Sequence, residues 1–164
     1  MKSYLLALNH GYLFFGTTVY VGVLWAMRFF WYPSWGQITL ADVPVHFVGP
    51  TSRATSFFTV VVPLMLLANL ILIISERKSP TVILAIIAAL CIGSATYVGQ
   101  AYIIPVNKLI GAGLTTQQEL HEKLGLWMNY NTIRFWLLSP MWLIMLLYFV
   151  IKGHLLDVLA GRQL

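Results

Sequence analysis

Four long runs of the chain contain no Asp, Glu, Lys or Arg, and shorter polar segments separate them. The runs are 25, 22, 29 and 17 residues long. About 20 largely apolar residues form a helix that crosses a bilayer, and in lipid only helices and closed barrels satisfy every backbone hydrogen bond. The pattern therefore predicts an all-α protein, a polytopic membrane four-helix bundle with spans at about 7–31, 54–75, 80–104 and 133–151.

Proline positions refine the third helix and the connections around it. Pro80 suits the first turn of that helix, where a missing N–H costs nothing. Pro105 is expected to end the same helix, because proline lacks the N–H that the next turn needs. Two long connections, at about 32–53 and 108–132, then lie on the same side of the membrane.

Composition supports a membrane protein. The chain is 59% hydrophobic and 9% charged, whereas soluble domains are about 45–50% apolar and about 25% charged. The net charge of +5 comes from cations spread along the chain, so the lipid bilayer and not nucleic acid is the expected partner. The single cysteine, Cys91, excludes a disulfide scaffold and a zinc site built on cysteine pairs.

Orientation follows from the flanking cations. Each side of the predicted bundle carries five Lys or Arg residues, so their number alone does not choose a direction. The tight turn of residues 76–79 contains Arg77 and Lys78 and is typical of a short cytoplasmic loop. We therefore predict an integral protein of a bacterial inner (plasma) membrane with both termini cytoplasmic. Residues 153–164 are expected to form a short amphipathic helix on the inner surface.

The polar segment before the fourth span predicts an additional helix. Thr116-Gln-Gln-Glu119 is a capping box, in which the Thr hydroxyl and the Glu carboxylate each accept a backbone N–H at a helix start. We expect an outer-face amphipathic helix at about 117–132 that leads into the fourth span. Its side chains recur at spacings of 4, 3, 4 and 3, which places them on one face: Leu120, Leu124, Trp127, Asn131 and Arg134.

The polar end of this face is the first candidate site. An arginine at membrane depth needs a partner, and Asn131 precedes Arg134 by one helical turn. The alternative is that Arg134 extends to the lipid headgroups. Asn107 leaves the third helix on the same side, where its side chain is expected to cap backbone carbonyls or to reach Arg134.

Arg28 completes the candidate polar site on the first helix. It lies at the same predicted membrane level, beside Phe29, Phe30, Trp31 and Tyr32. Such a cluster is typical of an aromatic belt at the membrane interface. It is also suited to the wall of a pocket for a flat lipophilic ligand.

Histidines and carboxylates give no strong cofactor signal. None of the four histidines lies mid-span, whereas a haem inside a bundle takes axial ligands from facing helices. A surface haem or metal held by His46 and His121 is the remaining alternative, with Asp42, Glu119 and Glu122 as further ligands. Glu119 and His121 diverge on a helix, however. We predict no cofactor and no metal site.

The segment of residues 105–134 resembles the signature of the anthrone-oxygenase-like family of small four-helix membrane proteins. That signature runs Pro-x-Asn, then Trp, a His or Asn, and Arg before the last span. A few members oxidise polycyclic anthrones to quinones without metal or flavin, and most have no assigned activity. The matching residues here are Pro105, Asn107, Trp127, Asn131 and Arg134. Asn131 stands where members often carry His, and an amide cannot act as a base.

Two functional hypotheses remain. In the first, Arg28, Asn107, Asn131 and Arg134 with nearby aromatics line a pocket that binds or oxidises a flat, lipophilic, aromatic or quinone-like molecule. In the second, the chain is a non-catalytic accessory subunit that binds partner subunits of a larger membrane complex. The first predicts that Arg28 and Arg134 converge on a cavity. The second predicts arginines bound to backbone carbonyls in a bundle without a cavity.

Overall fold

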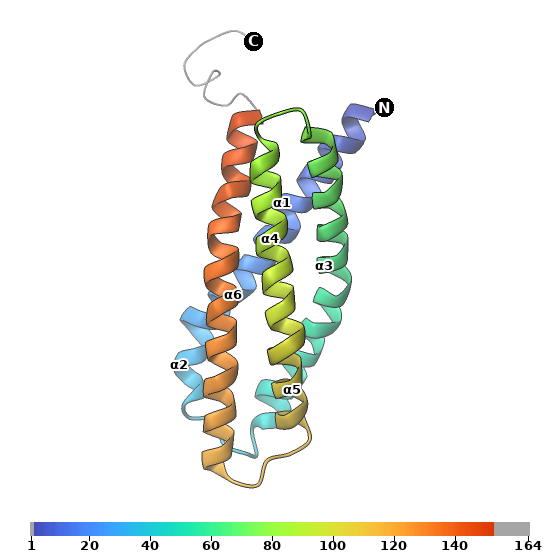
Figure 1. Cartoon of the computed structure of the whole chain (residues 1–164). Helices are drawn as coiled ribbons and strands as arrows, with labels where there is room; N and C mark the ends of the chain where they lie inside the picture. The colour runs from blue at the N-terminus through green and yellow to red at the C-terminus, as the bar shows by residue number, and fades with distance from the viewer. Residues whose placement is uncertain (1, 153–164) are drawn as a thin grey trace.

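The computed structural model describes residues 2–152, and every regular element in that range is helical (Figure 1). Residues 153–164, with the expected surface helix, lie outside the described residues. Three short π-helical turns alternate with the α-helices. In chain order the elements are α1 (Lys2–Ala26), η1 (Met27–Trp31), α2 (Tyr32–Trp35), η2 (Pro44–Val48), α3 (Gly49–Glu76), α4 (Val82–Val98), η3 (Gly99–Ile103), α5 (Ile104–Gly111) and α6 (Gln117–Lys152).

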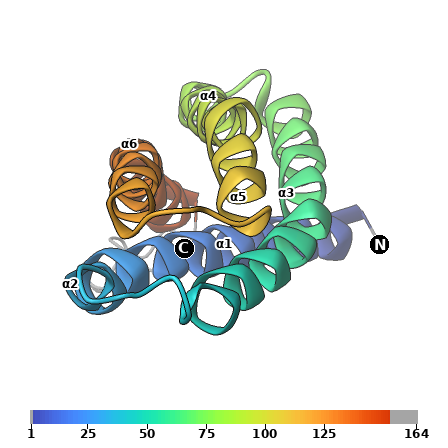
Figure 2. The ribbon, with the colours of Figure 1, turned by 90° about the horizontal axis from the view of Figure 1, so that it is seen from below.

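These elements join end to end into four long helical rods. Each rod is long and apolar enough to cross a membrane, so the predicted all-α four-helix membrane bundle is confirmed. α1 packs against α3 and α6, and α4 packs against the same two helices from the opposite side (Figure 2). Large apolar side chains fill the interface, among them Leu13, Met65, Leu72, Ile92, Met141 and Met145.

The two ends of the bundle differ in their connections. The turn of residues 77–81 lies at the same end as Lys2 and Lys152, and we call this the turn end (Figure 1). The connections 36–43 and 112–116 lie at the opposite end, which we call the loop end (Figure 1). This is the grouping of segments that the sequence predicts.

The first loop-end connection is much shorter than predicted, 36–43 instead of 32–53. The prediction began the second span after the charged Arg53, but helical structure already begins at Pro44 and Arg53 lies inside α3. In the second connection, predicted at 108–132 with a helix at about 117–132, only residues 112–116 lie outside helices. The additional helical residues there include Lys108, which lies in α5.

Pro105 does not end the third rod. It occupies the first turn of α5, directly after the π-helical turn η3. A first turn needs no intrahelical N–H donor, so the rod continues to Gly111. Asn107 is therefore a side chain on a helix face instead of a helix cap.

The predicted helix 117–132 and the predicted fourth span form one continuous helix, α6. At its start the Glu119 N–H donates to the Thr116 hydroxyl over 3.1 Å, as the capping box predicts. The Glu119 carboxylate accepts from the Thr115 N–H instead of the Thr116 N–H. The predicted face of α6 points inward, with Leu120, Leu124, Trp127 and Asn131 buried and Arg134 half-buried.

Candidate ligand cavity at the loop end

A cavity of about 370 Å³ lies in the loop half of the bundle, between side chains of all four rods. Most of its wall is apolar, with Leu24, Met27, Phe58 and Val62 among the lining residues. Ligand pockets commonly combine such a wall with a few placed polar groups. The polar lining residues are Tyr20, Thr51, Arg53, Thr55, Thr59, Thr96, Gln100, Asn107, Asn131 and Arg134.

Arg134 is fixed in this wall by two neutral oxygens. Its Nη1 donates to Asn131 Oδ1 over 2.8 Å, and its Nη2 donates to the Tyr20 hydroxyl. The guanidinium carbon also lies 5.2 Å from the centre of the Tyr20 ring, within cation–π range. The Nε atom is buried and has no hydrogen-bond acceptor among the described residues. The guanidinium is therefore held in place but incompletely paired.

A chain of hydrogen bonds continues from Arg134 across the cavity wall. The Asn131 side-chain amide donates to the Trp127 carbonyl over 3.1 Å. The Trp127 indole N–H donates to Asn107 Oδ1 over 2.6 Å. The structure thus brings together Asn107, Trp127, Asn131 and Arg134, four of the five predicted site residues, and connects α6 to α5.

Arg28 lies outside the cavity. Its Nη1 donates to the Thr132 hydroxyl over 2.9 Å, and its guanidinium lies 5.4 Å from the centre of the Phe135 ring. Thr132 and Arg134 are two residues apart on α6, so they point to different sides of the helix. Arg28 and Arg134 therefore do not converge, although both lie at the loop end.

The cavity wall is positively charged. Arg53 of α3 lines it together with Arg134, and no Asp, Glu or His is among the lining residues in the described part of the chain. The ion pair found within residues 2–152 joins Lys152 to Glu76, at the turn end. Within residues 2–152, neither Arg53 nor Arg134 has a carboxylate partner.

An aromatic cluster closes the cavity on the loop side. The rings of Trp35 and Trp127 are 5.1 Å apart, and Phe47 lies 5.5 Å from Trp127. Gln117, at the start of α6, fixes the first connection over this cluster. Its Nε2 donates to the Ile38 carbonyl over 2.6 Å, and its Oε1 accepts from the Leu40 N–H over 3.2 Å.

Threonines of α3 give the wall a row of oxygen atoms. Thr51, Thr55 and Thr59 recur every four residues, and each hydroxyl donates to the carbonyl four residues earlier. Because each threonine hydroxyl donates its proton within the helix, its oxygen can only accept a further hydrogen bond from a ligand. The wall thus offers hydrogen-bond donors on the arginines and acceptors on α3.

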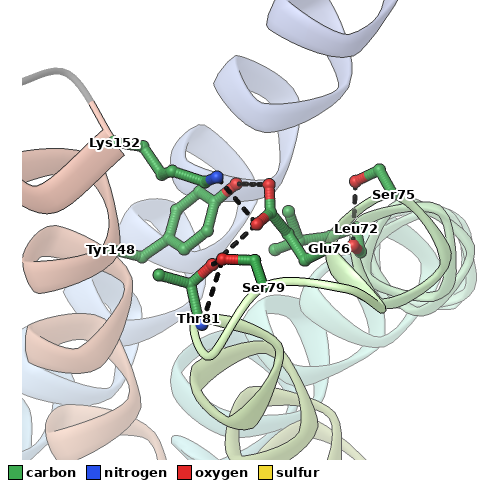
Figure 3. Close-up of polar contacts among 7 residues, drawn as sticks. All are labelled: Leu72, Ser75, Glu76, Ser79, Thr81, Tyr148 and Lys152. Atoms are coloured by element: carbon green, nitrogen blue, oxygen red, sulfur yellow. Dashed lines mark hydrogen bonds and ion pairs between the residues drawn. The ribbon is translucent and has the colours of Figure 1, made fainter.

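Sequence reasoning missed a polar cluster at the turn end (Figure 3). It assigned Glu76 to an exposed turn, but the side chain is buried between α3, α4 and α6. Glu76 accepts from the Tyr148 hydroxyl over 3.0 Å and from the Thr81 hydroxyl over 2.6 Å, and it pairs with Lys152 at 2.8 Å. Two spacings in the sequence are compatible with it. Glu76 lies seven residues, or two helical turns, after Asn69, and Lys152 follows Tyr148 by one helical turn.

The histidines considered as cofactor ligands lie apart from the cavity. His46 is exposed and lines a second hollow, of about 470 Å³, with Asp42. His121 contacts the Gln117 side-chain amide at 2.9 Å. Within residues 2–152, no three His, Cys, Asp or Glu side chains are grouped closely enough to hold a metal ion.

Comparison with known proteins adds no relative. No protein-family model matches the chain, and neither a curated protein nor a solved structure does. The resemblance to the anthrone-oxygenase-like family therefore stays a prediction.

Proposed function

We propose that this membrane protein binds a flat, lipophilic, oxygen-bearing small molecule, aromatic or quinone-like, in the loop-end cavity. The observation that carries the proposal is Arg134, which Asn131 and Tyr20 hold in a largely apolar cavity wall and which has no carboxylate partner within residues 2–152. A charged group in apolar surroundings without a compensating partner is costly, and a ligand oxygen beside the guanidinium lowers that cost.

The apolar wall suits the body of such a ligand. Aromatic rings contribute to it from three rods, including Trp35, Phe58 and Trp127. Offset-stacked and edge-to-face contacts with these rings orient a flat molecule. Several lining residues of α3 are exposed, including Arg53 and Phe57, so the ligand enters between lipid and the α3 wall.

Oxidation of the ligand is the finer part of the proposal and rests on the family resemblance. In that reaction a ring methylene and O₂ give a ring carbonyl and water. Fixed positive charge stabilises an enolate or phenolate that forms on the way, and Arg134 would supply it. The cavity wall offers Tyr20, Arg53 and Arg134 as its titratable groups, so binding is the primary assignment. The proposed location is a bacterial inner membrane, with both termini cytoplasmic and the loop end outside.

The accessory-subunit hypothesis makes the opposite expectation for these side chains. It requires arginines bound to backbone carbonyls and a filled bundle. In the described residues Arg134 contacts two side chains and lines a cavity. Arg28 does not line it, which departs from the convergence that the ligand-binding hypothesis expects. We therefore favour ligand binding and retain the subunit hypothesis as an outcome of the test.

Tryptophan fluorescence of the purified protein tests the proposal directly. Trp31, Trp35 and Trp127 line the cavity, so a bound quinone quenches their emission. We expect 9,10-anthraquinone to bind more tightly than anthracene, which has the same ring shape without oxygen. Losing a hydrogen bond to a charged group costs about 1.5–3 kcal/mol, so Arg134→Gln should weaken anthraquinone binding roughly 10- to 100-fold.

Arg28→Gln is the matched control, because Arg28 lies at the same end but outside the cavity. It should leave anthraquinone binding unchanged. Equal binding of anthracene and anthraquinone would contradict the role of the oxygen. Absence of binding together with a stoichiometric co-purified polypeptide would favour the accessory-subunit hypothesis instead.

A further inference from the structure

We infer that the ligand carries a negative charge when it binds, as an oxyanion attached to the apolar body. This inference rests on the proposed function and narrows its ligand class. It distinguishes an acid from a neutral quinone or ketone, both of which satisfy the proposal above.

The first argument is the charge balance of the cavity. Arg53 and Arg134 line it, and no lining residue in the described range is acidic. Arg134 is partly buried in a largely apolar wall and has no carboxylate partner within residues 2–152. A charge held away from water without a counter-charge is costly.

The second argument is that the hydrogen-bond partners of Arg134 are uncharged, so they leave its positive charge without a counter-charge. Asn131 and Tyr20 each contribute one uncharged acceptor. Lys152, on the same helix, is instead paired with the buried Glu76 carboxylate at 2.8 Å. The same fold therefore compensates one α6 cation with its own acid and leaves the other to be compensated from outside.

The third argument is the position of the second arginine. Arg53 is exposed on the α3 wall, whereas Arg134 is half-buried. Opposite charges attract over about 8–10 Å at ordinary salt, so Arg53 favours arrival of an anion and Arg134 holds it. The planar guanidinium of Arg134 suits a two-oxygen group such as a carboxylate or phosphate.

A pair of ligands of equal shape separates charge from shape. Anthraquinone-2-carboxylate and anthraquinone-2-carboxamide differ in charge but have nearly the same size. In phosphatidylcholine nanodiscs at neutral pH, we expect the acid to quench tryptophan emission with at least tenfold higher affinity than the amide. Arg134→Gln should abolish this preference, and Arg53→Gln should reduce it and weaken its salt dependence.

Two further variants show whether a lost preference for the acid comes from the changed site or from misfolding of the protein. Arg134→Lys keeps the charge and should retain part of the preference for the acid. Arg28→Gln should retain all of it. Nanodiscs containing phosphatidylglycerol identify the source of the oxyanion: competition with the acid supports recognition of a lipid phosphate, and unchanged affinity supports a free acid.

The possible failures are distinct. Equal affinity of the unmodified protein for acid and amide would overturn the inference and leave the proposed function standing. Failure of both compounds to bind would overturn the proposed function, and the inference with it.

Discussion

Lys152 at the turn end and Arg134 at the loop end are both cations carried by α6, and their surroundings differ. Lys152 pairs with Glu76, whose carboxylate also accepts from Tyr148 and Thr81 (Figure 3). Arg134 contacts two neutral oxygens and borders a cavity. Within residues 2–152, one helix thus carries one cation paired with a carboxylate and one that contacts only neutral oxygens.

The difference separates a structural role from a binding role. An ion pair with a buried carboxylate already has its counter-charge, so it gains little from a ligand, and it is strongly destabilised when one partner is removed. An incompletely paired cation beside a cavity contributes less to the fold but has free energy to gain from a ligand. The turn end should therefore control stability, and the loop end should control binding.

The largest expected effect is at Glu76. Glu76→Gln removes the charge that compensates Lys152 while keeping the side-chain size. Breaking a buried pair costs about 3–5 kcal/mol, and Lys152 is 40% exposed, so we expect a loss of about 3 kcal/mol, at the low end of that range. Thermal unfolding in detergent measures it. Glu122→Gln, at an exposed position of α6, is the control and should unfold like the unmodified protein. An unchanged unfolding temperature for Glu76→Gln would show that the Glu76–Lys152 pair does not control stability.

A smaller effect is expected at Arg134, and only when ligand is present. A ligand at about 30 times its Kd stabilises the folded state by about 2 kcal/mol. This gain should appear as a higher unfolding temperature in the unmodified protein and in Glu76→Gln, and a 10- to 100-fold weaker affinity should reduce it to about 0.2–0.8 kcal/mol in Arg134→Gln. Equal ligand-induced stabilisation in Arg134→Gln would show that the loop end binds without this guanidinium.

Gln117 tests the closure of the loop end. Gln117→Ala removes two hydrogen bonds to the first connection, each with a net contribution of about 1 kcal/mol or less. We expect the Leu40 amide to exchange its hydrogen severalfold faster, with little change in the unfolding temperature. Gln118→Ala is the neighbouring control, since Gln118 bonds Glu122 on its own helix. Equal protection of Leu40 in both variants would mean that Gln117 does not hold the connection.

The smallest effect is a pH dependence at Asp42, in the same connection. The Thr39 hydroxyl and N–H donate to this carboxylate, over 2.7 and 3.0 Å, and hold the pKa of Asp42 below its usual range. A lowered pKa gives stability at neutral pH that is lost as the pH falls through the pKa of the folded protein. Asp42→Asn should therefore be slightly less stable at pH 7, and the difference should shrink as the pH falls below the usual pKa of aspartate and through the lowered pKa of the folded protein. Unfolding temperatures across this range measure the difference, and parallel curves would contradict it.

The helical rods and one face of α6 were predictable because each depends on local pattern alone. The spacing of Leu120, Leu124, Trp127, Asn131 and Arg134 fixes which side of a helix they share, wherever that helix packs. Asn107 could be placed near them because the third rod ends on the same side. The grouping of Asn107, Trp127, Asn131 and Arg134 could therefore be predicted from the positions and directions of two helices.

The remaining parts depend on packing that no local pattern specifies. Arg28 lies at the predicted level, within the π turn η1, but it faces Thr132 and Phe135 of α6 instead of the cavity. Glu76 was assigned to solvent because a charged residue beside Arg77 and Lys78 is typical of a loop. Its burial depends on Tyr148 and Lys152, more than 70 residues away in the chain.

The three π-helical turns have a consequence for how this chain tolerates insertions and deletions. Their ends are marked by backbone N–H groups of Tyr32, Gly49 and Ile104 that donate to carbonyls five residues earlier. A π turn holds one residue more than an α turn, so loss of one residue from η3 restores a regular helix. Each residue turns an α-helix by about 100°, and the deletion would therefore rotate Asn107 away from Trp127 while leaving α4 intact. Single-residue length changes within 27–31, 44–48 and 99–103 would change which side chains face the loop end and would leave the α-helices α1, α3 and α4 intact.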